Sequence, residues 1–77
     1  MTITSTSEQV LVDTDAHVLT ITLNRPEKLN SVTQSMSDAL VTIIEEANAD
    51  DEVRVIILTG SGQRSFCAGS DIASLDA

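Results

Sequence analysis

Two short segments near the start of the chain alternate apolar with polar residues, a pattern typical of half-buried β-strands. The first covers residues 9–13, and the second covers residues 17–23 and is rich in β-branched residues. In the second strand we expect Val18, Ile21 and Leu23 on one side, with Leu19 pointing the other way. Residues 13–16 between them are mostly turn formers, so we expect a β-hairpin. Pro26 cannot donate a ladder hydrogen bond and therefore ends the second strand, which leaves residues 25–30 as a loop.

The apolar spacing then changes to three and four residues, which is typical of a helix with one face packed on a core. We expect this helix to start from Ser31 or Thr33, with Ser31 as its N-cap, and to end at Asn48. Its length would be about 17 residues, or about 25 Å. Residues 50–52 are acidic and follow as a solvated turn. The apolar positions of the helix are Val32, Met36, Ala39, Leu40, Ile43, Ile44 and Ala47.

A third strand is expected over residues 53–58, where four apolar residues follow Arg54 in succession. An uninterrupted apolar run is typical of a strand covered on both faces, as in a parallel sheet between two layers of helices. Only one full helix is expected in the chain. The second face of the sheet must therefore be covered by something other than these elements.

A small-residue stretch, from Arg64 to Ile72, joins this strand to a possible helix start. The order of strand, glycine-bearing loop and helix start turns several backbone N–H groups toward one point, which suits an oxygen that develops negative charge. Ala68, Gly69 and Ser70 are small, so a ligand carbonyl can approach the backbone closely. The alternative is an ordinary strand-to-helix turn in which Gly69 permits the bend.

Three segments carry a resemblance to a known family. Residues 23–31 read L-N-R-P-E-K-L-N-S, residues 55–60 read V-I-I-L-T-G and residues 66–71 read F-C-A-G-S-D. In order and spacing they resemble the L-N-R-P-x-x-x-N-[AS] segment, the following strand and the F-x-A-G-x-D segment of the crotonase family, the enoyl-CoA hydratases and isomerases. The resemblance covers nearly the whole chain from Val10 to Asp76, although family members run to several times this length. It implies an α/β fold, namely the first β-β-α-β part of a crotonase-like ββα spiral, incomplete in this chain.

The resemblance also implies a substrate and a set of site residues. The family holds the thioester oxygen of an acyl-CoA between two backbone N–H donors, and Ser70 matches the residue that supplies one of them. Lys28 and Leu29 match residues that line the CoA groove, with Lys28 a candidate phosphate contact. Ala68 matches the loop whose main-chain carbonyls receive the adenine amino group. The expected substrate-binding residues are Lys28, Leu29, Ala68, Gly69, Ser70 and Asp71, although Asp71 is also a candidate helix N-cap.

The reaction remains open among several members of the family. Enoyl-CoA hydration is favoured, with isomerisation or another crotonase-type reaction as alternatives, and the proton-transfer residues are expected beyond residue 77. No cofactor is expected, because CoA enters as part of the substrate, and the family suggests a homo-oligomer, a trimer or a hexamer. A different alternative is that these 77 residues are an inactive fragment that associates with itself or with a partner through the uncovered sheet face.

Composition argues against several other classes of function. The net charge of −8 and the single aromatic residue, Phe66, argue against binding to nucleic acid, and the same charge would repel an anionic membrane surface. The single cysteine, Cys67, permits no internal disulfide and no cysteine zinc site, and we interpret it as a small buried hydrophobe. No secretory signal, transit peptide or apolar run of ~20 residues is visible, so we expect a cytoplasmic protein with residues 1–8 disordered and residues 9–77 forming part of one domain.

Three other candidates have structural interpretations. His17 lies at the expected hairpin turn, far from the loop that would hold Ser70, so a Ser-His-Asp triad is rejected. Residues 50–52 lack the spacing that wraps a calcium ion, and no metal site is expected. Arg25 is interpreted as an ion-pair partner or as a side chain whose stem packs along the sheet.

Overall fold

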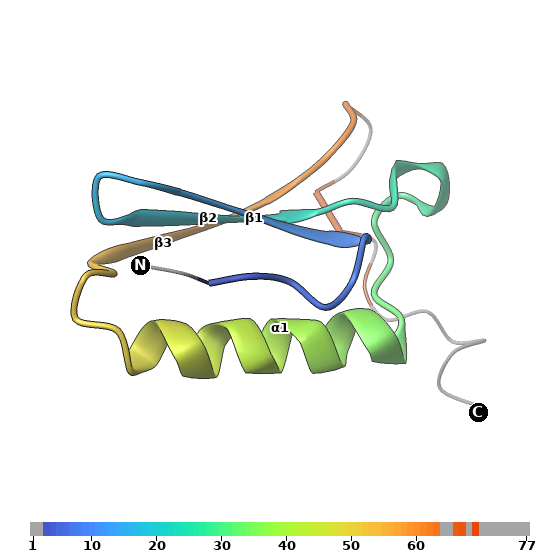
Figure 1. Ribbon diagram of the computed structural model, residues 1–77. Helices are drawn as coiled ribbons and strands as arrows, with labels where there is room; N and C mark the ends of the chain where they lie inside the picture. Colours follow the sequence, from blue (N-terminus) through green and yellow to red (C-terminus); the bar gives the residue numbers. More distant parts are fainter. Residues whose placement is uncertain (1–2, 64–65, 68, 70–77) are drawn as a thin grey trace.

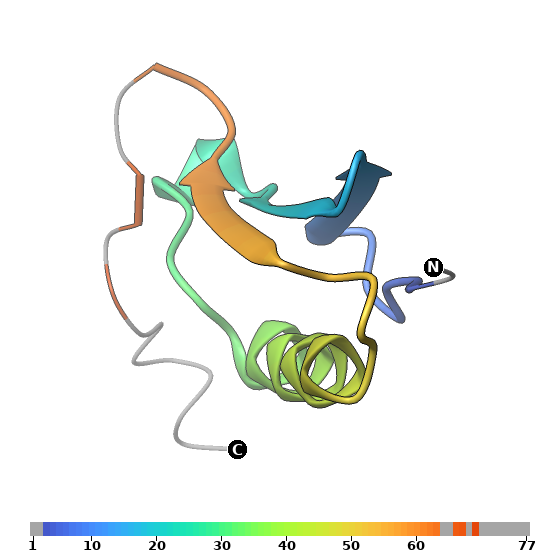
Figure 2. The same ribbon diagram turned by 90° about the vertical axis from the view of Figure 1, so that its left-hand side faces the viewer.

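A three-stranded sheet with one long helix across one of its faces makes up the fold (Figure 1). The computed structural model describes residues 3–63, 66, 67 and 69. Its elements are β1 (Val10–Asp15), β2 (Val18–Leu23), the 3₁₀ helix η1 (Pro26–Lys28), α1 (Gln34–Asn48) and β3 (Val55–Gly60). β1 pairs antiparallel with β2, and β2 pairs parallel with β3. The predicted α/β class and β-β-α-β order are confirmed, and Figure 2 shows α1 end-on below the sheet.

The hairpin turn differs from the prediction. Asp13, Thr14 and Asp15 continue β1, and the turn consists of Ala16 and His17, both with positive φ (46° and 71°). Positive φ at both central residues matches the right-handed twist of the flanking strands. The predicted turn over residues 13–16 was therefore wrong, because strand pairing as far as Asp15↔Val18 outweighs the turn preference of the two aspartates.

The helix begins later than its expected N-cap. Thr33 caps α1, since its Oγ1 accepts a hydrogen bond from the Met36 N–H at 3.3 Å, so the assignment of Ser31 as N-cap was wrong. The Oγ of Ser31 instead accepts a hydrogen bond from an Arg25 guanidinium nitrogen at 3.0 Å. The expected end at Asn48 is confirmed.

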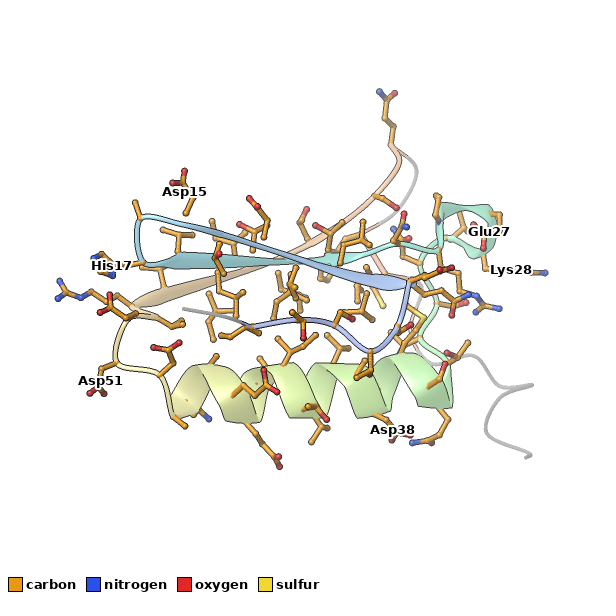
Figure 3. All side chains as sticks on the ribbon, viewed as in Figure 1. Asp15, His17, Glu27, Lys28, Asp38 and Asp51 are labelled. Atoms are coloured by element: carbon orange, nitrogen blue, oxygen red, sulfur yellow. The ribbon has the colours of Figure 1, made fainter. Side chains whose placement is uncertain are left out.

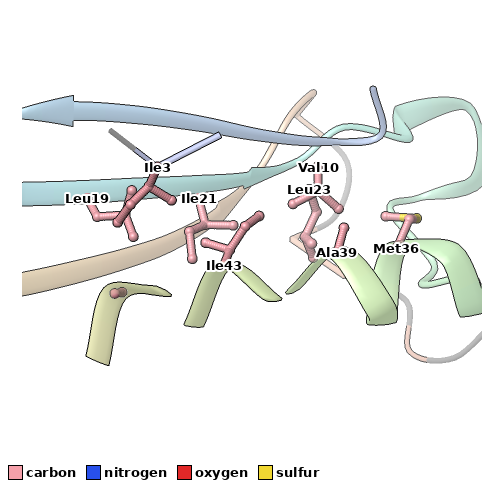
Figure 4. Close-up of a cluster of buried hydrophobic side chains, with 9 residues drawn as sticks. Ile3, Val10, Leu19, Ile21, Leu23, Met36, Ala39 and Ile43 are labelled. Carbon is pink, nitrogen blue, oxygen red and sulfur yellow. The ribbon is translucent and has the colours of Figure 1, made fainter. Parts of the chain in front are cut away.

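The core lies between the sheet and α1 (Figure 4). Alternate residues of β2 point into it, and α1 contributes positions three and four residues apart. The expectation that Leu19 points the other way from Ile21 and Leu23 was wrong, because Leu19 is fully buried on the same face, and Val18 lies on the opposite one. Ile3 is also in this core, 8% exposed, while the predicted disorder of residues 1–8 as a whole stays a prediction. The buried apolar residues are Ile3, Val10, Leu19, Ile21, Leu23, Met36, Ala39, Ile43 and Ala47.

β3 is a strand, as predicted, but it spans Val55–Gly60 where residues 53–58 were expected, and both of its faces are partly exposed. Val55 and Ile57 point to one side of the sheet and Ile56 and Leu58 to the other, because successive side chains alternate along a strand. All four are between 40% and 50% exposed. The described part of the chain thus covers each face of β3 only in part, in keeping with the expectation that one helix is too little for this sheet.

Candidate functional site

The chain leaves the sheet twice at the same edge. β2 and β3 run parallel, and their last residues, Leu23 and Gly60, are partners in the ladder. Residues 24–33, which we call the η1 loop, follow β2, and residues 61–69, the post-β3 segment, follow β3. Ser61 connects the two segments where they leave the sheet. Its N–H donates to the Leu23 carbonyl at 2.8 Å, and its Oγ donates to Asn24 Oδ1 at 3.1 Å.

Asn30 links the two loops from the inside. It is fully buried, and it is the only buried polar residue in the described part of the chain. Its Oδ1 accepts a hydrogen bond from the Arg25 N–H at 2.9 Å, and its Nδ2 donates to the Ser61 carbonyl at 2.8 Å. Its φ is 58°, a left-handed conformation that asparagine tolerates better than most residues. One amide group thus holds the η1 loop closed and ties it to the start of the post-β3 segment.

The η1 loop exposes one of its two cations and uses the other internally. A guanidinium nitrogen of Arg25 donates to the carbonyl oxygen of Ser31 at 3.2 Å as well as to its Oγ, which stiffens the loop. Lys28 is exposed at the end of η1, beside Glu27, and its side chain points away from the fold (Figure 3). Leu29 follows with φ 55° and is 36% exposed. Lys28 and Leu29, the two residues expected to line a CoA groove, therefore lie on an accessible surface.

The far end of the post-β3 segment is held by the same loop. The Val32 N–H donates to the Gly69 carbonyl at 2.8 Å. The Gly69 N–H lies 3.4 Å from the Sγ of Cys67, which is half-buried and packs against the core. Gly69 has φ 99°, a conformation that side-chain-bearing residues rarely adopt, and a Cβ built on it would meet none of the described residues within 4 Å. Ala68, Ser70 and Asp71, three of the predicted site residues, lie outside the described residues.

Gly60 is where the sheet and the post-β3 segment come closest. A Cβ added to Gly60 would overlap the main-chain carbonyl of Phe66 and would lie 2.7 Å from Asn30 Nδ2. Only a residue without a side chain permits this approach. Neither Gly60 nor Asn30 was predicted as a site residue from the sequence. The signal for Asn30 was present, because it is the second asparagine of the L-N-R-P-x-x-x-N-[AS] match.

His17 lies at the opposite end of β2 from η1 (Figure 3). Its Nδ1 is 2.8 Å from the main-chain oxygen of Glu52 and 3.2 Å from the Glu52 Oε2. The imidazole therefore pins the hairpin turn to the acidic turn before β3. No three His, Cys, Asp or Glu side chains of the described residues are arranged to hold a metal ion, and no described helix is long and apolar enough to cross a membrane.

Comparison with known proteins gives this arrangement a family. A sequence profile described as enoyl-CoA hydratase/isomerase matches residues 18–77. The chain belongs to this crotonase family. The Mycobacterium tuberculosis protein named "Probable enoyl-CoA hydratase EchA14" is 41% identical over 70 residues, 91% of this chain and 27% of that protein. The 1,2-epoxyphenylacetyl-CoA isomerase of Escherichia coli is 43% identical over 65 residues, 84% of this chain and 24% of that enzyme.

A solved crotonase structure matches the fold as well as the sequence. The carnitinyl-CoA hydratase of Mycobacterium avium superposes with a TM-score of 0.85 at 37% identity, over 92% of this chain and 27% of that one. The predicted resemblance to the N-terminal portion of a crotonase is thereby confirmed. The chain spans about a quarter of the length of the relatives that it matches.

Proposed function

We propose that this chain supplies the CoA-binding loop and one oxyanion donor of an enzyme that acts on an acyl-CoA thioester. The observation that carries the proposal is the meeting of the η1 loop with the post-β3 segment at the carboxyl edge of two parallel strands. This edge is where open α/β sheets usually bind their ligands. The substrate-binding residues are Lys28, Leu29, Ala68, Gly69, Ser70 and Asp71, and the catalytic group is the backbone N–H of Ser70.

The chemistry follows from what a thioester carbonyl needs. As an enolate or a tetrahedral adduct forms, negative charge moves onto the carbonyl oxygen, and a fixed N–H aimed at that oxygen stabilises it. One donor does not move protons, so we place the second donor and the acid and base in the part of the crotonase fold that this chain does not span. CoA is part of the substrate in this proposal, and no further cofactor is invoked. Hydration of an enoyl-CoA is the reaction we favour, with isomerisation as the alternative.

The direct test uses the complete gene product that carries this chain. We expect it to hydrate crotonyl-CoA, measured as loss of the conjugated enoyl thioester absorbance and as a product heavier by one water in mass spectrometry. Product of unchanged mass with a moved double bond would replace hydration by isomerisation. Neither binding nor conversion of any enoyl-CoA across a range of chain lengths would overturn the proposal.

Lys28→Glu tests the CoA contact. We expect the KM for the thioester to rise about fivefold at low salt, and the difference to shrink as salt is added, because an exposed cation close to a phosphate acts through a screened field. The matched control is Arg54→Glu, which makes the same change of charge at an exposed position before β3. Equal effects of the two substitutions would mean that Lys28 acts only through net charge, and an unchanged KM at low salt would remove the contact.

A second candidate function rests on the exposed faces of β3. In this alternative the 77 residues catalyse nothing and associate through the apolar side chains of Val55, Ile56, Ile57 and Leu58. Among the described strands β3 lies at an edge of the sheet, so its outer backbone groups are available for pairing with a second copy. Light scattering of the isolated 77-residue chain, eluted from a sizing column over a range of concentrations, should then show a dimer or larger species. A monomer at every concentration would exclude this candidate.

A further inference from the structure

Asn30 occupies a position that the proposed chemistry does not explain. It is fully buried between the η1 loop and the post-β3 segment. Its Oδ1 accepts a hydrogen bond from Arg25 in the first, and its Nδ2 donates one to Ser61 in the second. An amide can do both at once, whereas an ionised carboxylate only accepts and an aliphatic side chain does neither. Removing one partner of a buried hydrogen bond leaves the other unsatisfied, which makes this position sensitive to small chemical changes.

Residues 30–32 hold the post-β3 segment at both of its ends. The Asn30 side chain binds the Ser61 carbonyl at its start, and the Val32 N–H binds the Gly69 carbonyl near its end. Between these ties, the Phe66 carbonyl and the Asn30 amide both lie against Gly60. Two residues of the η1 loop, Asn30 and Val32, therefore hold the post-β3 segment at Ser61 and at Gly69.

The same loop carries the residues that we place against CoA. Lys28 and Leu29 immediately precede Asn30, and the Asn30 N–H donates to the Arg25 carbonyl at 2.9 Å, which closes the turn around η1. A shift of this turn would move the Asn30 amide and, with it, the Ser61 carbonyl. The loop that carries the proposed CoA contacts is thus hydrogen-bonded, through Asn30 and Val32, to the segment that precedes Ser70 in the chain.

We propose that Asn30 is a positioning residue that fixes the post-β3 segment, and with it the oxyanion donor, to the CoA-binding η1 loop. This inference rests on the proposed function for its catalytic consequence. Its structural part, the clamp between residues 30–32 and residues 61–69, stands on the hydrogen bonds alone. The two parts are therefore tested by separate measurements.

The test compares Asn30→Asp with Asn30→Leu in the complete gene product. Near neutral pH the introduced carboxylate cannot donate to the Ser61 carbonyl, and we expect kcat to fall more than about tenfold while KM changes less than about threefold. Burial beside that carbonyl raises the pKa of the introduced carboxyl, so lowering the pH restores a donor O–H. The kcat of Asn30→Asp relative to the unsubstituted protein at the same pH should then recover, whereas that of Asn30→Leu should stay low throughout.

Hydrogen exchange provides the readout that needs no turnover. In both variants at neutral pH, peptides covering residues 61–69 should exchange faster than in the unsubstituted protein, with peptides of α1 unchanged, and only Asn30→Asp should regain protection at lower pH. If the protein binds no thioester but shows this exchange pattern, the proposed function fails and the clamp stands. Should Asn30→Asp not fold, Asn30→Ala replaces it as a variant without a buried charge, expected to expose residues 61–69 at every pH.

The contrary results are equally definite. Exchange that rises in α1 and in residues 61–69 together would show that Asn30 only supports the fold. A kcat deficit of Asn30→Asp that is independent of pH would show that the donor to Ser61 has no role in positioning. Unchanged exchange at residues 61–69 in Asn30→Ala would overturn the clamp itself.

Discussion

Ser70→Pro is expected to lower kcat for thioester turnover by about 10²- to 10³-fold in the complete gene product, the effect that loss of one oxyanion donor typically has. Proline carries no N–H, so the substitution removes the proposed donor. The side chain itself has no part in this role. Ser70→Ala keeps the N–H and should therefore retain nearly the activity of the unsubstituted protein.

Two measurements separate loss of the donor from general damage. Circular dichroism and a thermal melt establish that Ser70→Pro is folded, and binding of a saturated acyl-CoA, which cannot be hydrated, shows whether the groove is intact. We expect binding to change far less than kcat, because the donor acts most strongly once charge has developed on the oxygen. Near-normal kcat in a folded Ser70→Pro variant would remove Ser70 from the mechanism.

Elements whose signal lies within a few residues were predictable from the sequence. The strand character of β2 followed from its alternation, although Leu19, expected to point away from Ile21 and Leu23, is buried on the same face as those two residues. The buried face of α1 follows in the same way from its three- and four-residue spacing. The resemblance to the crotonase family added the order of the elements and indicated that the η1 loop and the post-β3 segment form the site.

Features that depend on distant partners were not predictable. The hairpin turn sits at Ala16 and His17, where the imidazole contacts Glu52, 35 residues further along the chain. The Asn30 amide donates a hydrogen bond to Ser61, 31 residues away, and no local sequence pattern indicates that pairing. The N-cap is a different case, because the partner is near: Thr33 caps α1, and Ser31 instead bonds Arg25 within the η1 loop. The His17 and Asn30 contacts are long-range pairings that a local sequence pattern does not encode.

The exposure of β3 is another feature that the local sequence pattern did not predict. The apolar run predicts a strand covered on both faces, and the strand is present, yet its side chains remain 40% to 50% exposed. The run specifies an environment that the described part of the chain does not provide. The relatives are about four times as long as the segment that matches this chain. We therefore expect the residues that cover β3 to lie in the part of the crotonase fold that this chain does not span.

Gly60→Ala is expected to lower the free energy of unfolding by about 3 kcal/mol, the upper part of the usual range for overpacking. The added methyl group would overlap the Phe66 carbonyl and would lie 2.7 Å from Asn30 Nδ2. Main chain cannot move aside as the end of a flexible side chain does. Gly60 does not have a positive φ, so the cost comes from packing and not from the backbone conformation of alanine. Denaturant unfolding of the purified protein measures it.

Gly69→Ala is the matched control, because it makes the same chemical change in the opposite setting. A Cβ at Gly69 meets nothing within 4 Å, but φ is 99°, so only backbone strain opposes it. Adding Asn30→Ala to Gly60→Ala should not restore stability, since the overlap with the Phe66 main chain remains. Full recovery in that double variant would place the conflict at the Asn30 amide alone. A Gly60→Ala protein as stable as the unsubstituted one would mean that the post-β3 segment is not held against the sheet. That result would also contradict the clamp proposed for Asn30, which requires this close contact.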